Sequence, residues 1–535
     1  MYFKIFVNLS KKPLYLQLYL YPQIFRQNRK FYHNLPFFNL YKNVIGEPIT
    51  ENYAADLKKK HPKIYNLSSE QLQNTVQILR KFGINAEDAC LNPHIFCMNP
   101  ITMDNYGEIL RECNFAIIQP KHIIRYHTLV KSRTISQLKN EGLLKSDLSL
   151  EQLLYDCFND WPREYITFLN FPDGNTNILT VRLSLIERYL QWKFSITSNQ
   201  FKDYCKNYLP LKHRPMCDIQ ESLHIALNDI KFNEETITKN GFIISSDPTN
   251  TKLILENVTT LAELDIRDAI RKEPAILKNN YQSLLEIKEI LEQYNISNEA
   301  QRLNFKVYCM RPQTVRARLE HLVNLKEYQV LASNPRVLYM VVHEKKMMTR
   351  IARIQSARKQ CFSLNHLVSS VKVFNTYINN FGNRACGRDI AILISSSLHT
   401  KGISNKSVLD KLKRHKYWLH TALNVIGENL NFLKKEFKHD VIFNNCQILL
   451  YPLFELENYI NILLKVRKSG TFTETSNIEL DTTYKNLNCS LLTDNQILSL
   501  VLYEIEKKYH FSGDGVWSRT DCKHTQTQVK QNVVN

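Results

Sequence analysis

Apolar residues recur at helical spacing along most of this chain, whereas the alternation of apolar and polar residues that is typical of strands is hard to find. In the run after Ile266–Leu277, Leu284, Ile287 and Leu291 fall on one face at a period of 3.6 residues. A proline lies beside such runs again and again, with an apolar residue four positions before it and another three positions after it. This pattern occurs at Pro274, Pro312 and Pro335 and, with departures, at Pro93, Pro120, Pro162, Pro210, Pro248 and Pro452.

Proline lacks an amide hydrogen and disfavours helix at the preceding residue, so each proline predicts that a short helix ends there and that a second helix follows. A single unit of this kind cannot bury its own apolar face, whereas stacked units can. A repeat of roughly 25 to 45 residues without strand signals therefore predicts an all-α fold, an α-solenoid of helical repeats.

The pattern also divides the chain into segments. We expect the solenoid over residues 68–465, a polar linker over 466–492, a last helix over 493–511 with Thr493 as its N-cap, and a disordered tail over 512–535. Residues 1–46 hold seven basic residues and no acidic residue, which is typical of a mitochondrial presequence. The alternatives are a disordered N-terminus or a secretory signal with its apolar core at Leu14–Leu20, and we expect a linker over 47–67.

Composition supports this interpretation. Glycine is scarce, with 13 in 535 residues, which disfavours all-β and α/β architectures. No run of 18 apolar residues exists, so we expect no membrane-spanning helix. The 12 cysteines are scattered without a CxxC motif, which favours free thiols over a disulfide framework or a zinc site.

Positive charge is concentrated rather than spread evenly. The net charge is +19, and residues 302–359 hold 13 basic residues against three acidic ones. A focused basic surface indicates a nucleic acid or an anionic membrane as the partner.

The strongest candidate within this region is a predicted amphipathic helix from about Glu344 to Lys359. Its basic face carries Lys346, Arg350 and Arg353, and the arginines favour contact with phosphates or guanine edges over a merely solvated lysine-rich face. Arg316 lies four residues before Glu320, so an intrahelical ion pair is its alternative role. The full set of candidate nucleic-acid-binding residues is Arg316, Arg318, Arg336, Lys345, Lys346, Arg350, Arg353, Arg358, Lys359, Lys411, Lys413, Arg414 and Lys416.

Signatures of catalysis are absent from the sequence, which has no glycine-rich phosphate loop, no HExxH and no GxSxG motif. We therefore predict a protein that is not an enzyme and that needs no cofactor or metal. Four aromatic residues near the basic region have the spacing of core residues, so we assign none of them to stacking on an extruded base: Tyr308, Tyr328, Tyr339 and Phe362.

The repeat resembles that of the mitochondrial transcription termination factor (mTERF) family. The resemblance rests on the unit at Ile266–Leu277, its echoes at Asn334–Leu338 and Asn92–Phe96, and the closing segment Leu449–Glu457, and it spans about residues 70–465. It implies a superhelix of repeats, each with two α-helices and a 3₁₀ turn, that holds duplex mitochondrial DNA along a basic concave face. The composition, rich in Asn, Lys, Ile and Tyr, suggests an invertebrate, insect member.

The expected function is regulation of mitochondrial transcription, by termination, attenuation or initiation, in the nucleoid of the matrix. The expected partner is double-stranded mitochondrial DNA, together with another mTERF-family protein or the transcription machinery, and without a membrane. Two alternatives stay open: an RNA-binding or ribosome-assembly factor that uses the same face on rRNA, and a protein scaffold whose positive charge only follows composition.

Overall fold

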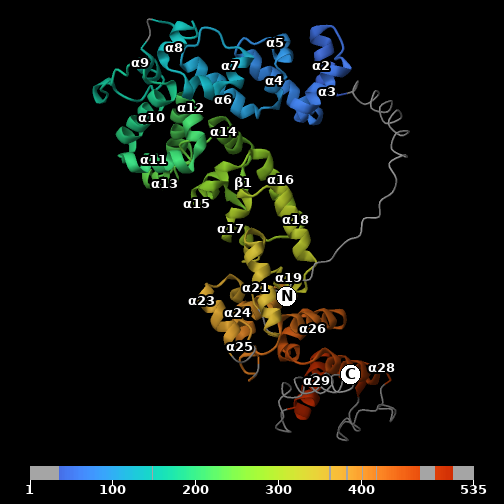
Figure 1. The fold of residues 1–535 in the computed structure, drawn as a ribbon. Helices are drawn as coiled ribbons and strands as arrows, with labels where there is room; N and C mark the ends of the chain where they lie inside the picture. Colours follow the sequence, from blue (N-terminus) through green and yellow to red (C-terminus); the bar gives the residue numbers. More distant parts are fainter. Residues whose placement is uncertain are drawn as a thin grey trace, which may run out of the picture. The chain divides into compact units, whose positions relative to one another are not determined.

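The fold is all-α, as the apolar spacing predicted (Figure 1). The computed structural model describes residues 35–146, 149–360, 363–380, 384–399, 402–416, 418–469 and 489–509. They belong to two compact units, Met1–Lys252 and Leu253–Asn535, which divide within helix α14 (Pro248–Asn257). No helix in the described ranges is long and apolar enough to cross a membrane.

Unit 1 consists of short helices joined by tight turns. Its elements are α2 (Pro36–Ile45), α3 (Glu51–Lys60), η2 (Pro62–Asn66), α4 (Ser69–Lys81), α5 (Ala86–Leu91), η3 (Pro93–Cys97), α6 (Pro100–Glu112), α7 (Pro120–Ile124), η4 (Thr128–Ser132), α8 (Ile135–Asn140), α9 (Leu150–Tyr155), η5 (Arg163–Tyr165), α10 (Ile178–Phe194), α11 (Ser198–Asn207), η6 (Leu209–His213), α12 (Met216–His224), η7 (Ile225–Asp229) and α13 (Glu234–Lys239). The η elements are 3₁₀ helices except η4 and η7, which are π-helices.

Unit 2 continues the same pattern. Its elements are β1 (Thr260–Leu261), β2 (Leu264–Asp265), α15 (Ile266–Lys272), η8 (Pro274–Lys278), α16 (Tyr281–Gln293), α17 (Asn298–Leu303), η9 (Phe305–Cys309), α18 (Pro312–Val323), α19 (Lys326–Leu331), α20 (Leu338–Val342), α21 (Glu344–Ser356), α22 (Leu364–Val368), α23 (Val371–Asn379), α24 (Gly387–Leu398), α25 (Asn405–Leu412), α26 (Leu423–Glu436), α27 (His439–Asn444), η10 (Cys446–Leu450), α28 (Leu453–Ser469), η12 (Cys489–Leu491) and α29 (Asp494–Tyr509). The two strands pair as an antiparallel hairpin whose turn residues, Ala262 and Glu263, both have positive φ.

The repeat is an α-helix, a 3₁₀ turn and a second α-helix, which is the longer of the two except in α11–η6–α12. It is explicit in α3–η2–α4, α5–η3–α6, α11–η6–α12, α15–η8–α16, α17–η9–α18 and α27–η10–α28. The 3₁₀ turns begin at Pro62 and Pro93 in unit 1 and at Pro274 and Phe305 in unit 2, which places neighbouring repeats 31 residues apart. The expected composition of the repeat is confirmed.

The proline pattern in the sequence merges two positions of this repeat. Pro93 and Pro274 start the 3₁₀ turn, where the missing amide hydrogen ends the preceding helix. Pro100 and Pro312 start the longer helix, where a first-turn amide needs no intrahelical partner. Prolines at the start of the 3₁₀ turn and at the start of the following helix both have apolar neighbours. The same spacing of apolar residues around proline therefore described both positions.

The core of each unit forms where longer helices pack against each other. In unit 2, α16 and α18 lie side by side (Figure 1), and Leu284, Ile287 and Leu291 of α16 and Val315 and Leu319 of α18 are all fully buried. Burying such side chains stabilises the fold by about 1.5–3 kcal/mol each. Stacking, rather than a single central core, therefore holds the unit together.

A recurrent hydrogen bond joins successive repeats, and we call it the carbonyl clamp. In each clamp, a polar side chain on or just before the helix that ends one repeat donates to backbone carbonyls at the end of the next repeat's turn. Thus Asn429 on α26, which is fully buried, donates from Nδ2 to the carbonyls of Leu449 (2.9 Å) and Tyr451 (2.8 Å) after η10. The donors of such clamps are Arg182, Ser222, Asn279, Arg318, Arg350 and Asn429.

The clamps satisfy carbonyls that a helix end leaves without intrahelical partners. The donor lies on or just before the closing helix of its repeat, although its residue type changes between arginine, asparagine and serine. Because the acceptors are backbone groups, the sequence of the acceptor segment carries no sign of the interaction.

The N-terminal boundary corrects the sequence interpretation. Residues 1–34 lie outside the described residues, but α2 and α3 are folded within the segments that we expected to be a presequence and a linker. Phe37 is fully buried and packs edge-on against Phe96 of the first explicit repeats, with ring centroids 5.2 Å apart. Ala54, Leu57 and Ile64 are buried as well. The acid-free charge pattern of residues 1–46 led us to overlook the apolar face of α2, which packs against the first repeats.

At the other end, α28 extends to Ser469, beyond the predicted start of the linker at 466, and residues 470–488 lie outside the described residues. The last helix lies where we expected it. Thr493 is its N-cap, because the hydroxyl oxygen accepts from the amide of Gln496 at 3.4 Å. The tail from 510 onward is not described.

Candidate nucleic-acid interface

The basic helix predicted from the sequence is α21. Met347, Ile351 and Ile354 are buried on one face, so Lys346 and Arg353 project from the opposite side into solvent. The helix ends at Ser356 rather than at Lys359. Its last turn closes through Arg358, which adopts a left-handed conformation with φ of 52°.

A groove of about 580 Å³ lies along the basic face of α21 and is bounded by α18, the end of α20 and α23. It brings together five of the candidate residues: Arg318, Lys345, Lys346, Arg350 and Arg353. Its other walls are Val342, His343, Glu344, Thr349, Val371 and Phe374. We refer to it as the basic groove.

Two of these arginines are donors of carbonyl clamps. Arg350 is only 5% exposed, and its Nη1 donates to the carbonyls of Leu367 (2.5 Å) and Ser369 (2.7 Å) and, at 3.3 Å, to His366. Arg318 donates to the carbonyls of Val341 and Val342 at the end of α20. The expectation that Arg350 grips phosphate from a solvent-facing position is therefore wrong, because backbone acceptors already hold its guanidinium.

Three other cations of the groove remain accessible. Lys345 and Lys346 are exposed, and neither ammonium group has a hydrogen bond or an ion pair within the described part of the chain. Arg353 is exposed as well; it donates to the side-chain oxygen of Asn375 at 3.1 Å, and its guanidinium lies 5.1 Å from the centre of the Phe374 ring. These three side chains are the ones that an incoming anion can meet.

The charge inside the groove is strongly positive. Its single carboxylate, Glu344, accepts from Arg318 at 3.0 Å and pairs with His321 at 2.9 Å. Burial and then the neighbouring Arg353 lower the pKa of Arg350. Burial lowers the pKa of His343, and cationic neighbours lower it further. Lys346 has the largest effect among these neighbours. A cluster whose cations repel one another favours an anionic ligand.

The positive surface continues past His343, which also lines a smaller cavity of about 180 Å³. Lys272, Arg302 and Lys306 line this cavity together with Glu273. Arg302 pairs loosely with Glu263, at 3.7 Å. The sequence analysis did not group these three cations, because they come from α15, α17 and η9, which only the folded chain brings together.

The sequence is similar to Transcription termination factor 5, mitochondrial, of Drosophila melanogaster. The two are 27% identical over 476 residues, which is 89% of this chain and 82% of the relative. The similarity thus covers both units and the basic groove. This similarity agrees with the resemblance of the repeat to that of the mTERF family. No family model matches the sequence, and no solved structure does. The relative is an insect protein, which agrees with the invertebrate composition expected from the sequence.

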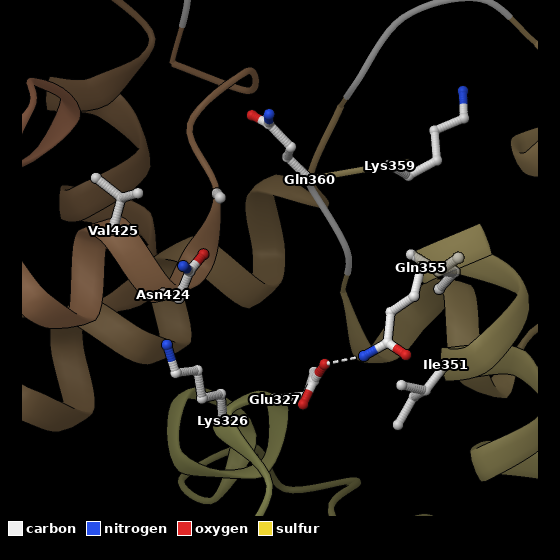
Figure 2. Close-up of a pocket in the computed structure, with 10 residues that line it drawn as sticks. Lys326, Glu327, Ile351, Gln355, Lys359, Gln360, Asn424 and Val425 are labelled. Atoms are coloured by element: carbon white, nitrogen blue, oxygen red, sulfur yellow. Dashed lines mark hydrogen bonds between the residues drawn. The ribbon is translucent and has the colours of Figure 1, made fainter. Parts of the chain in front are cut away.

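The remaining candidate residues lie outside the basic groove. Lys359 lines a separate cavity of about 290 Å³ on another face of α21, together with Lys326 and the start of α26. Figure 2 shows this cavity, in which Gln355 donates to Glu327 across 2.9 Å. The ammonium of Lys359 itself donates to the carbonyl of Asn380.

Arg316 and Arg336 have partners within the chain. Arg316 donates to the side-chain oxygen of Gln293 at 3.1 Å, rather than forming the helical pair with Glu320 that we considered. Arg336 lies 3.7 Å from the buried carboxylate of Asp389. Both arginines are half-buried, so their main contribution is to packing between repeats.

The second predicted cluster lies at the end of α25 and just after it, and it does not line the basic groove. Lys413, Arg414 and Lys416 are exposed. Lys411 is half-buried, and its ammonium lies 4.8 Å from the centre of the Phe443 ring and 3.3 Å from the carbonyl of Asn444. Three of these four side chains therefore remain candidates for contact with a ligand.

Of the four aromatic residues near the basic region, two are core residues, and Tyr339 lines the smaller cavity beside His343. Tyr308 is fully buried and Tyr328 is 5% exposed, whereas Tyr339 is half-buried beside His343, with ring centroids 6.0 Å apart. Burial raises the pKa of Tyr328 to about 12. Phe362 lies outside the described residues.

Proposed function

We propose that this protein is a non-enzymatic mTERF-family regulator of mitochondrial transcription that binds double-stranded mitochondrial DNA in the matrix nucleoid. Lys345, Lys346 and Arg353 contact phosphates, while Arg318 and Arg350 hold the walls of the groove in place. The observation that carries the proposal is the basic groove itself, where exposed cations without internal acidic partners line one face of a rigid helix.

The similarity to the Drosophila relative supports the choice of partner, since that protein is named as a mitochondrial transcription termination factor. The first 34 residues serve as the mitochondrial presequence in this proposal. Lys413, Arg414 and Lys416 provide a second set of phosphate contacts. Bound across a transcription boundary, the protein acts as a roadblock to the polymerase or as a platform for a second mTERF-family protein.

Charge neutralisation predicts how binding depends on salt. Each phosphate that a lysine or arginine neutralises adds about 0.9 to the slope of log K against log salt on duplex DNA. Replacing Lys345, Lys346 and Arg353 by glutamine should therefore flatten the slope by up to about 2.7 if each contacts one phosphate. Binding should weaken on every sequence by a similar factor, because phosphate contacts carry no base information.

The experiment measures binding of the purified protein and the triple variant to sheared mitochondrial duplex DNA and to mitochondrial rRNA across a salt series. The matched control replaces Lys58, Lys59 and Lys60 of α3 by glutamine, which removes the same charge from an exposed face of unit 1. A flattened slope in the groove variant alone supports the proposal. Equal slopes in both variants would assign the binding to net charge, and a preference for rRNA would favour the ribosome-assembly role.

A further inference from the structure

Two thiols and a carboxylate meet in unit 1, far along the chain from the basic groove. Cys157 follows α9, Cys217 is the second residue of α12, and Glu112 ends α6. The sulfur atoms and a Glu112 oxygen all lie within 4.8 Å of one another. Both cysteines are free thiols, and the pair is separated by 60 positions in sequence. This juxtaposition has no part in the proposed DNA-binding function.

The two cysteine-bearing segments are held together by their own hydrogen bonds. The thiol of Cys217 lies 3.9 Å from the carbonyl oxygen of Cys157. Two to three residues further along each segment, the amide of Asn159 donates to Gln220 at 3.4 Å, and Gln220 donates to Asp160 at 2.8 Å. The backbone therefore holds the two thiols as neighbours, as a disulfide requires.

The environment gives the two sulfur atoms different reactivity. Among the cysteines whose side chains the structure describes, Cys217 is the exposed one. A hydrogen bond from the Cys157 thiol lowers the pKa of Cys217 by more than burial and the carboxylates of Glu112, Asp218 and Glu108 raise it. The place of Cys217 in the first turn of the nine-residue helix α12 also favours the thiolate. The same hydrogen bond, followed by burial, raises the pKa of Cys157. Cys217 is thus the nucleophile of the pair, and Cys157 is held protonated beside it.

Glu112 disfavours a metal ion as the occupant. One of its oxygens accepts from Nη1 of Arg182 at 2.8 Å, and the other accepts from the amide of Cys217 at 3.2 Å. Arg182 is fully buried, and Glu112 is its counter-ion. A divalent cation here would compete with a buried guanidinium for the same carboxylate, which is costly to leave unpaired.

We propose that Cys157 and Cys217 form a reversible disulfide, with a peroxide as the oxidant. The Cys217 thiolate attacks one peroxide oxygen, the O–O bond breaks, and Cys217 becomes a sulfenic acid as the other oxygen leaves as water. The Cys157 sulfur then attacks the Cys217 sulfur, the S–O bond breaks, and the hydroxyl leaves as water with the Cys157 proton. Two thiols lose two hydrogens, and one hydrogen peroxide becomes two waters.

Four other cysteines that the structure describes are less suited to this chemistry. Cys90, Cys113 and Cys446 are buried, and burial raises their pKa values to about 11, 12 and 11 respectively. Cys97 is half-buried like Cys157, and burial raises its pKa too. A selective oxidation of one pair is therefore expected under mild conditions.

The test treats the reduced full-length protein with increasing hydrogen peroxide, alkylates the remaining thiols and maps them by mass spectrometry. We expect a peptide pair linked through Cys157 and Cys217, with the loss of both alkylation sites, at a peroxide concentration that leaves Cys97 fully alkylated. The C157S variant should accumulate a sulfenic acid at Cys217 that dimedone traps. The C217S variant should lose the link, whereas C97S should keep it, and a thiol reductant should restore both sites.

Two results would overturn the proposal. Independent oxidation of Cys157 and Cys217 without a linked peptide would show that the pair does not couple. Stoichiometric zinc in the purified protein, lost in both C157S and C217S but kept in C97S, would make Glu112 and the two thiols a metal site instead. Binding to DNA tests the basic groove separately, so failure of one proposal leaves the other to its own experiment.

Discussion

Replacing Arg350 by glutamine separates the two roles that the sequence had merged. The guanidinium of Arg350 ties the end of α22 to α21 through three backbone carbonyls, and it also lies 4.6 Å from the centre of the Phe374 ring. Glutamine is shorter and uncharged, so it cannot reach the same acceptors. The structure therefore predicts a loss of stability before any loss of a phosphate contact.

The magnitude follows from the acceptors. A hydrogen bond to a charged group contributes about 1.5–3 kcal/mol, and a carbonyl left unsatisfied at a buried position costs a further 1–3 kcal/mol or so. The three bonds share one Nη1 atom and are not additive, and solvent reaches part of the site. We therefore expect the free energy of unfolding to fall by about 2–4 kcal/mol in Arg350→Gln.

Arg353→Gln is the matched control. Arg353 lies one turn further along α21 and over the same Phe374 ring, but it is exposed and its described hydrogen bond is to a single side chain. Its loss should change stability by no more than about 0.5–1 kcal/mol. Urea denaturation followed by circular dichroism measures both variants, and DNA binding is then compared under conditions where each is folded.

The opposite pattern would refute this reasoning. If Arg350→Gln unfolded at the same urea concentration as the unmodified protein, the carbonyl clamp would contribute nothing to the free energy of unfolding. If it also flattened the salt dependence of DNA binding as much as Arg353→Gln, Arg350 would be a phosphate ligand, as its helical spacing first suggested.

Three further perturbations test the packing of unit 2. Asp389→Ala removes the buried carboxylate that accepts from Asn334 at 2.9 Å, and should lower the free energy of unfolding by about 2–4 kcal/mol in urea denaturation; an unchanged midpoint would contradict it. Gly387→Ala places a Cβ 2.3 Å from the Trp418 ring. This clash should lower the free energy of unfolding by about 1–3 kcal/mol and shift the tryptophan fluorescence. An unchanged stability and an unchanged spectrum would contradict the prediction. Burial lowers the pKa of His366 to about 4, below its value in the unfolded chain, so its contribution to stability is complete above about pH 6.5 and is lost as the pH falls toward 4. An NMR titration midpoint for His366 near 6.5 would contradict that assignment.

Much of the fold could be predicted from local pattern alone. Period-3.6 spacing located α16 and α21, and the proline positions revealed the repeat, because both signals arise within one or two turns of chain. The first helices were missed because the acid-free composition of residues 1–46 dominated the interpretation. The apolar side chains of Phe37 and Phe38 carried the relevant signal, but their partner Phe96 lies in a later repeat.

In the candidate site, too, contacts between segments distant in sequence could not be predicted. Helical spacing placed Lys346, Arg350 and Arg353 on the basic side of α21, and the structure confirms that arrangement for Lys346 and Arg353. It could not show that backbone carbonyls from α22 hold Arg350, because any residue type supplies such acceptors. Nor could it group Lys272 and Lys306 with the groove, since that proximity depends on how successive repeats stack.

The carbonyl clamps give the stack a direction. In each of them the donor belongs to the earlier repeat and the acceptor to the later one, as from Asn279 to Tyr308 and from Asn429 to Tyr451. Because a ribosome makes the earlier repeat first, the donor is already in place when the next turn emerges. The growing chain thus provides its own template, one repeat at a time. A truncation from the C-terminus leaves donors that water can satisfy, whereas a deletion from the N-terminus removes the donors on which the following repeats were built.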